Sequence, residues 1–273
     1  MPQNFRNVGI VAGEGRLPIE IAKRLTDQGA PPHILTLRDD ADSFKGLYRS
    51  WIHLRYPSLG RVIKEVKKRD IREIILAGRV PKKFIYYIPA LFDPLSLKIL
   101  AKSARDDHSL LASIVAALEE AGCSVLPYWQ ILPEFMASEG CMGHRSPTSA
   151  ERDDFEYGAS ILRITLPCSF GQALVVADRA VVAIEAMEGT DSMVERAGKL
   201  VEKGVLVKMM RVDQDRRYDL PTIGPQTIEN MVRSGLSCLA VEARRTLIID
   251  VEQTLGLAKR HDIAVWGLPC QSS

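Results

Sequence analysis

Short β-branched runs alternate with helix-like segments along nearly the whole chain, and this alternation limits the fold more than any other feature. In the first half, four such runs are separated by three segments whose apolar residues recur at helical spacing. Strands that alternate with helices of this length form right-handed βαβ units on a parallel sheet. The runs are 7–13, 32–38, 73–80 and 123–129, and the helical segments are 16–29, 58–70 and 108–122.

The second half of the chain has its own alternating strands and helices. After a predicted helix around 155–164, the run ALVVADRAVVAIEA contains two apolar stretches divided by Asp178 and Arg179, which is typical of a hairpin or tight turn. Strands and helices then alternate over 205–268. We therefore predict an α/β protein in which a parallel-sheet domain is followed by a mixed α/β domain.

The boundary between the two predicted domains lies in a stretch of different composition. Residues 134–150, EFMASEGCMGHRSPTSA, are rich in Gly, Ser and Pro and have no apolar period, which is typical of a linker. We accordingly assign residues 1–133 to the N-terminal domain and residues 151–273 to the C-terminal domain.

The composition argues against several broad classes of protein. A hydrophobic content of 46% suffices for sizeable cores, and 36 basic against 34 acidic residues give no electrostatic footprint for nucleic acid. The five cysteines are widely spaced without a C-x-x-C pair, which argues against disulfides or structural zinc and favours a reducing cytosol. No leader-like start and no apolar run of membrane-spanning length is visible, so we expect a soluble, cytoplasmic protein.

The first candidate site is the glycine turn VAGEGRLP, which follows the first predicted strand. Gly13 and Gly15 would let backbone N–H groups approach a phosphate at the start of the next helix. Pro18 replaces the third glycine of a dinucleotide fingerprint, although Asp39 and Asp40 follow the second strand, where a ribose partner stands in such folds. The turn therefore fits either a nucleotide or phosphate site or a plain tight turn.

A second glycine turn, LAGRVPK, follows the third predicted strand. Turns at the carboxyl ends of neighbouring parallel strands face the same crevice, so Gly78 and Arg79 could surround one anionic group together with Gly13 and Gly15. An ordinary surface turn explains the spacing equally well.

The densest group of polar residues is VLVKMMRVDQDRRYDLPTIGPQTIEN, at 205–230. Carboxylates supply hard oxygen ligands for Mg²⁺, and cations neutralise the charge that develops in phosphate chemistry. Asp215 and Asp219 lie four residues apart, so both can face one ion if the loop curls. The alternative is a salt-bridged surface loop. The polar residues are Lys208, Gln214, Asp215, Arg216, Arg217 and Asp219.

The stretch EAMEGTDSMVERAG, at 185–198, joins an apolar strand to a helix. Thr190 is the predicted N-cap of that helix, and Asp191 would favour its positive end. Capping does not explain Glu185 and Glu188, which would meet the 205–230 loop at one sheet edge if the two strands are neighbours. Several carboxylates and cations in one crevice suggest a metal-assisted phosphoryl site.

These motifs together resemble the LpxI family of UDP-2,3-diacylglucosamine pyrophosphatases of lipid A synthesis. The similarity includes GEGRLP, AGRV, DDHSLLASIVAALEEAG, EAMEGTDSMVER and KMMRVDQDRRYDLPTIGPQTI, in order over nearly the whole chain. It implies a Rossmann-like N-terminal domain, a distinct C-terminal α/β domain, and Mg²⁺-dependent hydrolysis to UMP and 2,3-diacylglucosamine 1-phosphate (lipid X). The chain departs from the family where Phe170 precedes Gly171 and Gln172 in place of an acidic residue.

The resemblance and the polar residues lead to one mechanistic hypothesis, with the pyrophosphate in a cleft between the domains. Asp215, with one or more of Asp191, Glu188 and Asp219, would hold Mg²⁺, and an oriented water would attack phosphorus. Lys208, Arg216 and Arg217 would stabilise the leaving phosphate, with Asp215 and then Asp219 as the essential carboxylates. The residues assigned to substrate binding are Gly13, Gly15, Leu17, Pro18, Gly78, Arg79, Gln172, Gly189, Thr190, Gln214, Thr222 and Gly224.

A diacylated substrate also requires an apolar surface. The segment KKFIYYIPALFDPLSLKIL, at 82–100, could line an acyl groove and lean on the inner membrane, or it could be core beneath a long loop. A homodimer is a further expectation from the family. Two rival functions stay open: a non-catalytic nucleotide-sugar binder, and a nicotinamide-dependent oxidoreductase that uses GEGRLP and Asp39.

Overall fold

The computed structural model divides the chain into two compact units, 1–132 and 133–273, and each is considered by itself. The predicted cleft between domains therefore stays a prediction. The structure describes residues 5, 7–37, 40–54, 56, 58–79, 93–102, 107–169, 171–211 and 214–270.

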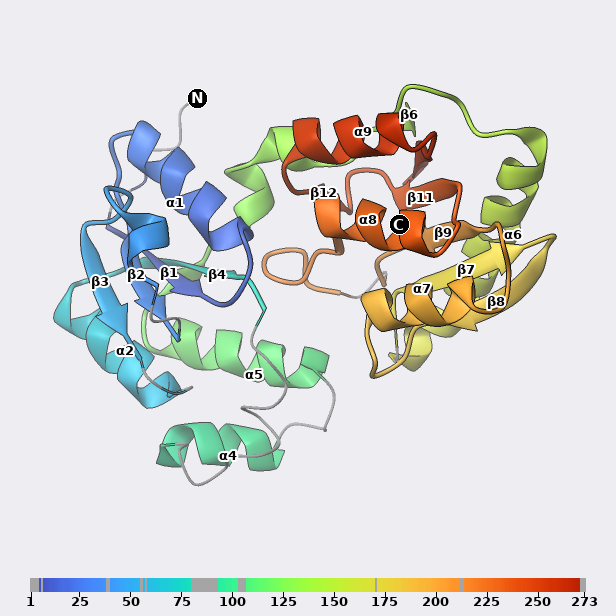
Figure 1. The fold of residues 1–273 in the computed structure, drawn as a ribbon. Coiled ribbons are helices and arrows are strands. Elements are labelled where there is room, and N and C mark those ends of the chain that lie inside the picture. Colours follow the sequence, from blue (N-terminus) through green and yellow to red (C-terminus); the bar gives the residue numbers. More distant parts are fainter. Residues whose placement is uncertain are drawn as a thin grey trace. The chain divides into compact units, whose positions relative to one another are not determined.

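The first unit contains a five-stranded parallel sheet in the order β3-β2-β1-β4-β5. This is the strand order expected of a doubly wound, Rossmann-like half-fold, so the predicted fold class is confirmed. Helix α1 covers one face of the sheet, and α2 and α5 cover the other (Figure 1). The elements are β1 (Val8–Ala12), α1 (Leu17–Asp27), β2 (His33–Thr36), η1 (Asp42–Phe44), β3 (Ser50–His53), α2 (Leu59–Lys68), β4 (Glu73–Ala77), α4 (Pro94–Lys102), α5 (Asp107–Glu120), β5 (Ser124–Val125) and η3 (Tyr128–Gln130).

Local sequence explains most of these elements. The prediction missed β3, whose four residues form the edge strand beside β2. Helix α2 begins after Ser58, whose hydroxyl accepts a hydrogen bond from the backbone N–H of Arg61. The inner strands are buried on both faces, as expected where helices cover a parallel sheet on each side.

The second unit contains a six-stranded mixed sheet in the order β6-β13-β11-β9-β7-β8. Strands β9, β11 and β13 are parallel, and β7 runs antiparallel to both β9 and β8. The predicted hairpin is present as β7 and β8, with Asp178 and Arg179 at positive φ in its turn. The elements are η4 (Pro133–Phe135), β6 (Gly140–Cys141), α6 (Ser149–Thr165), η5 (Leu166–Cys168), β7 (Ala173–Ala177), β8 (Ala180–Ile184), α7 (Thr190–Gly198), β9 (Val205–Lys208), β10 (Thr222–Ile223), α8 (Pro225–Arg233), β11 (Cys238–Glu242), β12 (Leu247–Ile248), α9 (Val251–Arg260) and β13 (Ala264–Leu268).

Helices cover both faces of this second sheet. Alternate residues along each strand point to opposite faces, so Leu174 and Val176 pack with α6 while Val175 packs with the other layer. Helix α6 forms one layer, and α7, α8 and α9 lie side by side in the other (Figure 1). The apolar faces of these helices bury two continuous cores.

The segment predicted to be a linker, 134–150, lies within the second unit. It contains β6, which pairs antiparallel with β13, and it ends in the first turn of α6. Thr148 and Glu151 form a capping box there, because each side chain accepts a hydrogen bond from the other residue's backbone N–H. A strand of two residues gives no detectable alternation, which explains why the pattern looked unstructured.

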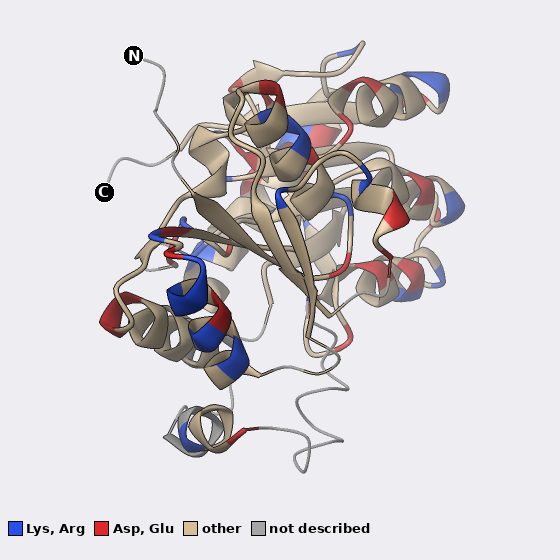
Figure 2. Ribbon diagram, turned by 90° about the vertical axis from the view of Figure 1, so that its left-hand side faces the viewer, with Lys and Arg blue, Asp and Glu red and all other residues tan. Residues whose placement is uncertain are grey.

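Lys and Arg are interspersed with Asp and Glu on the helices in Figure 2, rather than gathered into one field. Within the part of the chain that the structure describes, no helix is long and apolar enough to cross a membrane.

Candidate functional site

Most predicted catalytic residues follow strands that end at one edge of the second sheet. Because β7 is antiparallel to its neighbours, its first residue, Ala173, lies opposite Lys208, the last residue of β9. Strands β8 and β11 also end here, and we call this side the carboxyl edge. The sequence argument required β8 and β9 to be neighbours, and this condition is not met, because β7 lies between them.

Lys208 is the central cation of the carboxyl edge. Its Nζ donates hydrogen bonds to Thr190 Oγ1 at 3.4 Å and to the carbonyl oxygen of Thr222 at 3.1 Å. Burial lowers the pKa of Lys208, while the nearby carboxylates of Glu185, Asp191 and Asp219 act in the opposite direction. Among the described residues these two bonds leave one N–H of the ammonium for a ligand.

Glu185 fixes the residues around this lysine. Its Oε1 accepts a hydrogen bond from Thr190 Oγ1 at 2.8 Å, and its Oε2 accepts one from the backbone N–H of Gln172 at 3.0 Å. Gly171 is required here, since a Cβ would lie 2.2 Å from the carbonyl oxygen of Glu185. Glu185 therefore ties the start of β7 to the start of α7.

The prediction that Thr190 caps α7 is wrong. The N-cap is Gly189, with φ of 81°, and Thr190 is the first helical residue. The hydroxyl of Thr190 is instead shared between Glu185, to which it donates, and Lys208, from which it accepts. The Glu185 carboxylate thus accepts the hydrogen bond from the hydroxyl, and the hydroxyl oxygen accepts one from Lys208.

Asp191 lies beside Thr190 in the first turn of α7. Its Oδ1 accepts a hydrogen bond of 2.6 Å from Asn230 Nδ2 on α8, and Gln226 Nε2 donates to Asn230 Oδ1 at 2.9 Å. The side chain of Arg233 also donates to Asn230 Oδ1. Asn230 is buried, so its amide orientation is fixed by these donors and Asp191 is held in place.

The loop after β9 curls into one turn, as the spacing of its carboxylates suggested. The backbone N–H of Asp219 donates to the carbonyl oxygen of Asp215 at 3.3 Å. Asp215 itself accepts a fork of hydrogen bonds from Arg217, with the closest contact at 2.7 Å. Burial raises the pKa of the Asp215 carboxyl, but the bonds from Arg217 outweigh it and the net pKa is lowered. Burial beside these groups raises the pKa of Tyr218 to about 12.

The remaining predicted residues of this loop make structural contacts. Gln214 is buried; its Oε1 accepts from the backbone N–H of Arg211 at 3.3 Å, and its Nε2 donates to the carbonyl oxygen of Asp219 at 2.7 Å. Arg216 donates to the carbonyl oxygen of Arg244 at 2.7 Å. Gly224 is the N-cap of α8, and its backbone N–H donates to Thr227 Oγ1.

The predicted metal ligands do not gather into one group. Glu188 pairs with Arg196 at 2.7 Å, and this hydrogen bond is the main cause of its lowered pKa. Asp215 pairs with Arg217, and Asp191 with Asn230. Over the described ranges, no set of three or more His, Cys, Asp or Glu side chains is placed to hold a metal ion. As arranged, these carboxylates do not fit a multi-carboxylate metal centre.

In the first unit, the two glycine turns pair with each other. The backbone N–H of Glu14 donates to the carbonyl oxygen of Arg79 at 2.7 Å, and the N–H of Arg79 donates back to Glu14 at 2.9 Å. The N–H of Gly13 donates to the carbonyl oxygen of Ala77. These N–H groups are thus used within the fold rather than turned toward a phosphate.

The glycines permit the close approach of these turns. A Cβ on Gly13 would lie 2.7 Å from the carbonyl oxygen of Arg79, and one on Gly78 would lie 2.7 Å from that of Glu14. Leu17 and Pro18 are buried in the first turn of α1, while the Arg79 side chain is exposed and pairs with Glu14 at 3.6 Å.

Some predicted residues lie outside the described part of the chain. These are Asp39, Phe170 and the residues of the 82–100 segment before Asp93. Asp40, the other ribose candidate, accepts hydrogen bonds from the backbone and hydroxyl of Ser43 at the start of η1.

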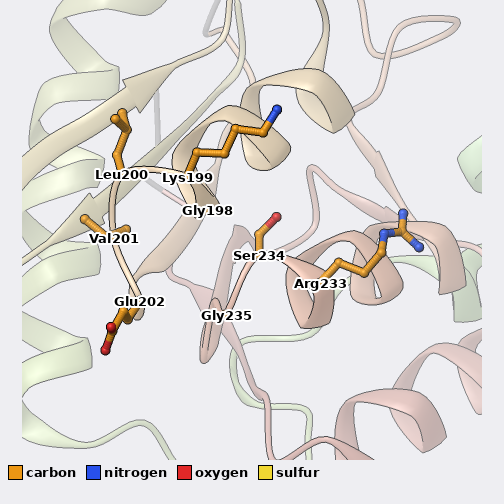
Figure 3. Close-up of a pocket in the computed structure, with 8 residues that line it drawn as sticks. All are labelled: Gly198, Lys199, Leu200, Val201, Glu202, Arg233, Ser234 and Gly235. Carbon is orange, nitrogen blue, oxygen red and sulfur yellow. The ribbon is translucent and has the colours of Figure 1, made fainter.

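A hollow of about 390 Å³ lies at the opposite end of α7 and α8 (Figure 3). Lys199 and Arg233 lie at the C-terminal ends of α7 and α8, and the side chain of Glu202 points away from both. Helix C-termini carry partial negative charge, so this position does not favour a phosphate. We therefore place the candidate site at the carboxyl edge, near Lys208.

Sequence reasoning assigned no individual role to three polar residues at or near this edge: Glu185, Asn230 and Glu242. Glu185 was noticed without a role, because its partner Gln172 becomes a neighbour only through the β7–β8 pairing. Asn230 lies on the first helix after the polar loop, and a buried amide on an amphipathic helix was the available signal. For Glu242 the signal was an acid at the end of the apolar run CLAVE.

Comparisons with known proteins agree with this two-part architecture. A family model described as the LpxI N-terminal domain matches residues 7–135, and one described as the LpxI C-terminal domain matches residues 138–266. The UDP-2,3-diacylglucosamine pyrophosphatase LpxI of Caulobacter vibrioides is 29% identical over 281 residues, which cover 98% of this chain and 99% of that protein. The solved structure of CobK precorrin-6A reductase aligns at 12% identity and a TM-score of 0.33, covering 98% of this chain and 89% of the other, which is too distant to support an argument. Because both family models match and together span nearly the whole chain, the protein belongs to the LpxI family.

Proposed function

We propose that this enzyme hydrolyses the pyrophosphate of UDP-2,3-diacylglucosamine in lipid A synthesis and releases UMP and 2,3-diacylglucosamine 1-phosphate. Family membership and the name of the Caulobacter relative support the substrate and the class of hydrolase. The structural observation that carries the proposal is the Lys208 cluster. It combines an oriented ammonium group, the first turn of a helix and several carboxylates at one sheet edge.

The chemistry of the cluster suits phosphate transfer to water. When water attacks one phosphorus, the bond to the bridging oxygen breaks and negative charge grows on the leaving phosphate. Lys208 can donate its third N–H to that charge, and the positive end of α7 adds to the effect. An anionic substrate also competes with Asp215 for the guanidinium of Arg217, which makes the carboxylate of Asp215 available to orient the water.

Mg²⁺ dependence is part of the proposal and is supported by the resemblance alone. Asp191 and Asp219 are two of the carboxylates that the sequence pattern assigned to the ion, and both act electrostatically on Lys208. The ion would neutralise phosphate charge. Among the described residues, the carboxylates are not assembled as a metal centre. Peripheral membrane contact and a homodimer likewise stay predictions.

Turnover by the purified chain tests the proposal. UDP-2,3-diacylglucosamine in detergent micelles is followed by phosphorus NMR, with Mg²⁺ and with EDTA. Asp215→Ala should lower kcat by about 10² or more, because it removes the carboxylate proposed to orient the attacking water. Asp153→Ala, an exposed carboxylate on α6, is the matched control and should keep wild-type turnover.

The outcomes separate the rival functions. Release of UMP that is lost in Asp215→Ala supports both the activity and the role of the loop. Turnover within about threefold of wild type in Asp215→Ala would contradict the assignment of this residue. Binding of UDP-2,3-diacylglucosamine without release of UMP would indicate a non-catalytic nucleotide-sugar binder. Binding of the reduced cofactor NAD(P)H would favour an oxidoreductase.

A further inference from the structure

Glu242 is a buried carboxylate at the carboxyl edge to which no role has been assigned. It is the last residue of β11, between β9 and β13, and only 4% of its surface is exposed. Its Oε2 accepts a hydrogen bond from the backbone N–H of Met210 at 3.2 Å, and its Oε1 lies 3.6 Å from Arg245 Nη1. Burial raises the pKa of Glu242, although Met210 and the nearby Arg245, Arg163 and Arg216 oppose the shift.

A series of buried and partly buried hydrogen bonds connects Glu242 to the loop that follows β9. Glu242 holds Met210, and the next residue, Arg211, donates its backbone N–H to Gln214 Oε1 at 3.3 Å. Gln214 Nε2 then donates to the carbonyl oxygen of Asp219 at 2.7 Å. The end of β11 is thus connected to the loop that carries Asp215 and Asp219.

Apolar side chains of the same volume as Glu242 and Arg245 would often give the folded state a greater stability. A buried ion pair often contributes less stability than apolar residues of the same volume. The Nε of Arg245 has no hydrogen-bond partner among the described residues, which adds to the cost. A carboxylate kept at such a position is more readily explained by the geometry that it imposes than by stability.

We propose that Glu242 is a positioning residue that places the loop after β9 by holding the backbone of Met210. The loop then presents Asp215 and Asp219 at the carboxyl edge, where Lys208 lies. This inference rests on the proposed function for its catalytic consequence, whereas its structural part, the placement of residues 209–211 and 214–219, can be measured independently.

Two conservative variants of the full chain separate the effect of side-chain length at position 242 from the effect of its charge. Glu242→Gln keeps the length of the side chain and an oxygen that can accept from Met210, but it loses the charge. Glu242→Asp keeps the charge, but its shorter side chain withdraws the acceptor from Met210. If Glu242→Gln leaves Arg245 unpaired and the protein unfolds at the assay temperature, the double variant Glu242→Gln with Arg245→Met is used instead.

The readouts are kcat and KM with UDP-2,3-diacylglucosamine, and hydrogen exchange of peptides covering 209–219. We expect Glu242→Asp to lower kcat by about 10²-fold with KM within about threefold, because small misplacements of reacting groups are costly. Exchange over 209–219 should rise about tenfold or more while that of β9 and β11 stays unchanged. Glu242→Gln should stay within about fivefold of wild-type kcat, since it restores the acceptor.

The matched control is a second carboxylate and arginine pair of this unit, in which the buried Glu151 pairs with the half-buried Arg145. It lies at the opposite edge, where Glu151 accepts from Ser237 just before β11. Glu151→Gln should lower the melting temperature, yet leave kcat and exchange over 209–219 unchanged.

The proposal is overturned if Glu242→Asp keeps wild-type kcat and exchange, or if Glu242→Gln lowers kcat as strongly as Glu242→Asp does. A wild-type protein without hydrolase activity would refute the proposed function instead. In that case exchange alone decides: faster exchange confined to 209–219 in Glu242→Asp supports positioning, and unchanged exchange overturns it.

Discussion

The hydroxyl group of Thr190 shows how one side chain can serve two neighbours. It donates its proton to Glu185 Oε1, which leaves the oxygen to accept from Lys208 Nζ. A carboxylate cannot donate and an ammonium cannot accept, so only a group with both capacities fits between them. Serine and threonine satisfy this requirement, and valine, with nearly the same shape as threonine, does not.

Thr190→Val should therefore lower kcat/KM by about 10-fold or more, because it removes an acceptor from Lys208 and a donor from Glu185. Thr190→Ser should stay within about threefold of wild type, since it keeps the hydroxyl. The measurement is initial rates at low substrate concentration. Full activity in the valine variant, with the serine variant equally active, would show that the hydroxyl does not organise the lysine.

The paired glycine turns after β1 and β4 show that glycine can serve the fold rather than a ligand. Gly78 has φ of 87°, and a Cβ there would meet the backbone of Glu14. Gly15 has φ of 100°, but a Cβ there would meet nothing within 4 Å. The two positions therefore separate backbone strain from steric overlap.

Gly15→Ala should destabilise the protein by about 1 kcal/mol, the cost of a side chain at positive φ. Gly78→Ala carries the same strain plus the overlap, so its loss should exceed that of Gly15→Ala by about 2 kcal/mol. Urea unfolding followed by circular dichroism measures both values. Equal losses would mean that the turns separate easily and do not need the close approach.

The elements that could be predicted from sequence are those whose pattern is local. The apolar period of Leu59–Lys68 and the apolar runs at Val8–Ala12 and Cys238–Glu242 can be recognised without knowledge of distant residues. In contrast, β3 and β6 are too short to show a period, and each is a strand only because an edge is available to it. The residues of β3 and β6 alone do not predict which distant strand each will pair with.

The candidate site divides in the same way. The carboxylate and lysine pattern predicted that Lys208, Asp191 and Asp219 belong to one site, and Lys208 does lie within the electrostatic reach of both carboxylates. The mistaken capping role of Thr190 came from local reasoning, because Glu185 approaches only after α7 has turned back on β8. Likewise, the bond from Met210 to Glu242 depends on the register of β9 and β11.

The second unit is held together at its other edge by a single network around Glu151. Arg145 makes a bidentate pair with Glu151 and also donates to the carbonyl oxygens of Ser237 and Asp262. The capping box with Thr148 adds the start of α6. One carboxylate thus connects the segment before α6, the start of β11 and the turn before β13.

The ionisation of Glu151 makes the stability of this unit depend on pH. Burial raises the pKa of its carboxyl, but hydrogen bonds from Arg145, Thr148 and Ser237 outweigh it and lower the pKa from 4.5 to about 2. The folded state therefore binds the proton more weakly than the unfolded state. The stabilisation is fully present above pH 4.5 and is lost as the pH falls toward 2.

Glu151→Gln tests this linkage, because glutamine can keep the capping box while it loses the charge. At neutral pH it should reduce the free energy of unfolding by on the order of 3 kcal/mol, the value of a shift of this size. Between pH 5 and 2 its stability should fall less steeply than that of the wild type, so the two curves should converge in acid. Glu195→Gln, an exposed position on α7, should follow the wild-type curve throughout. Parallel curves for Glu151→Gln and wild type would mean that another carboxyl group controls acid unfolding.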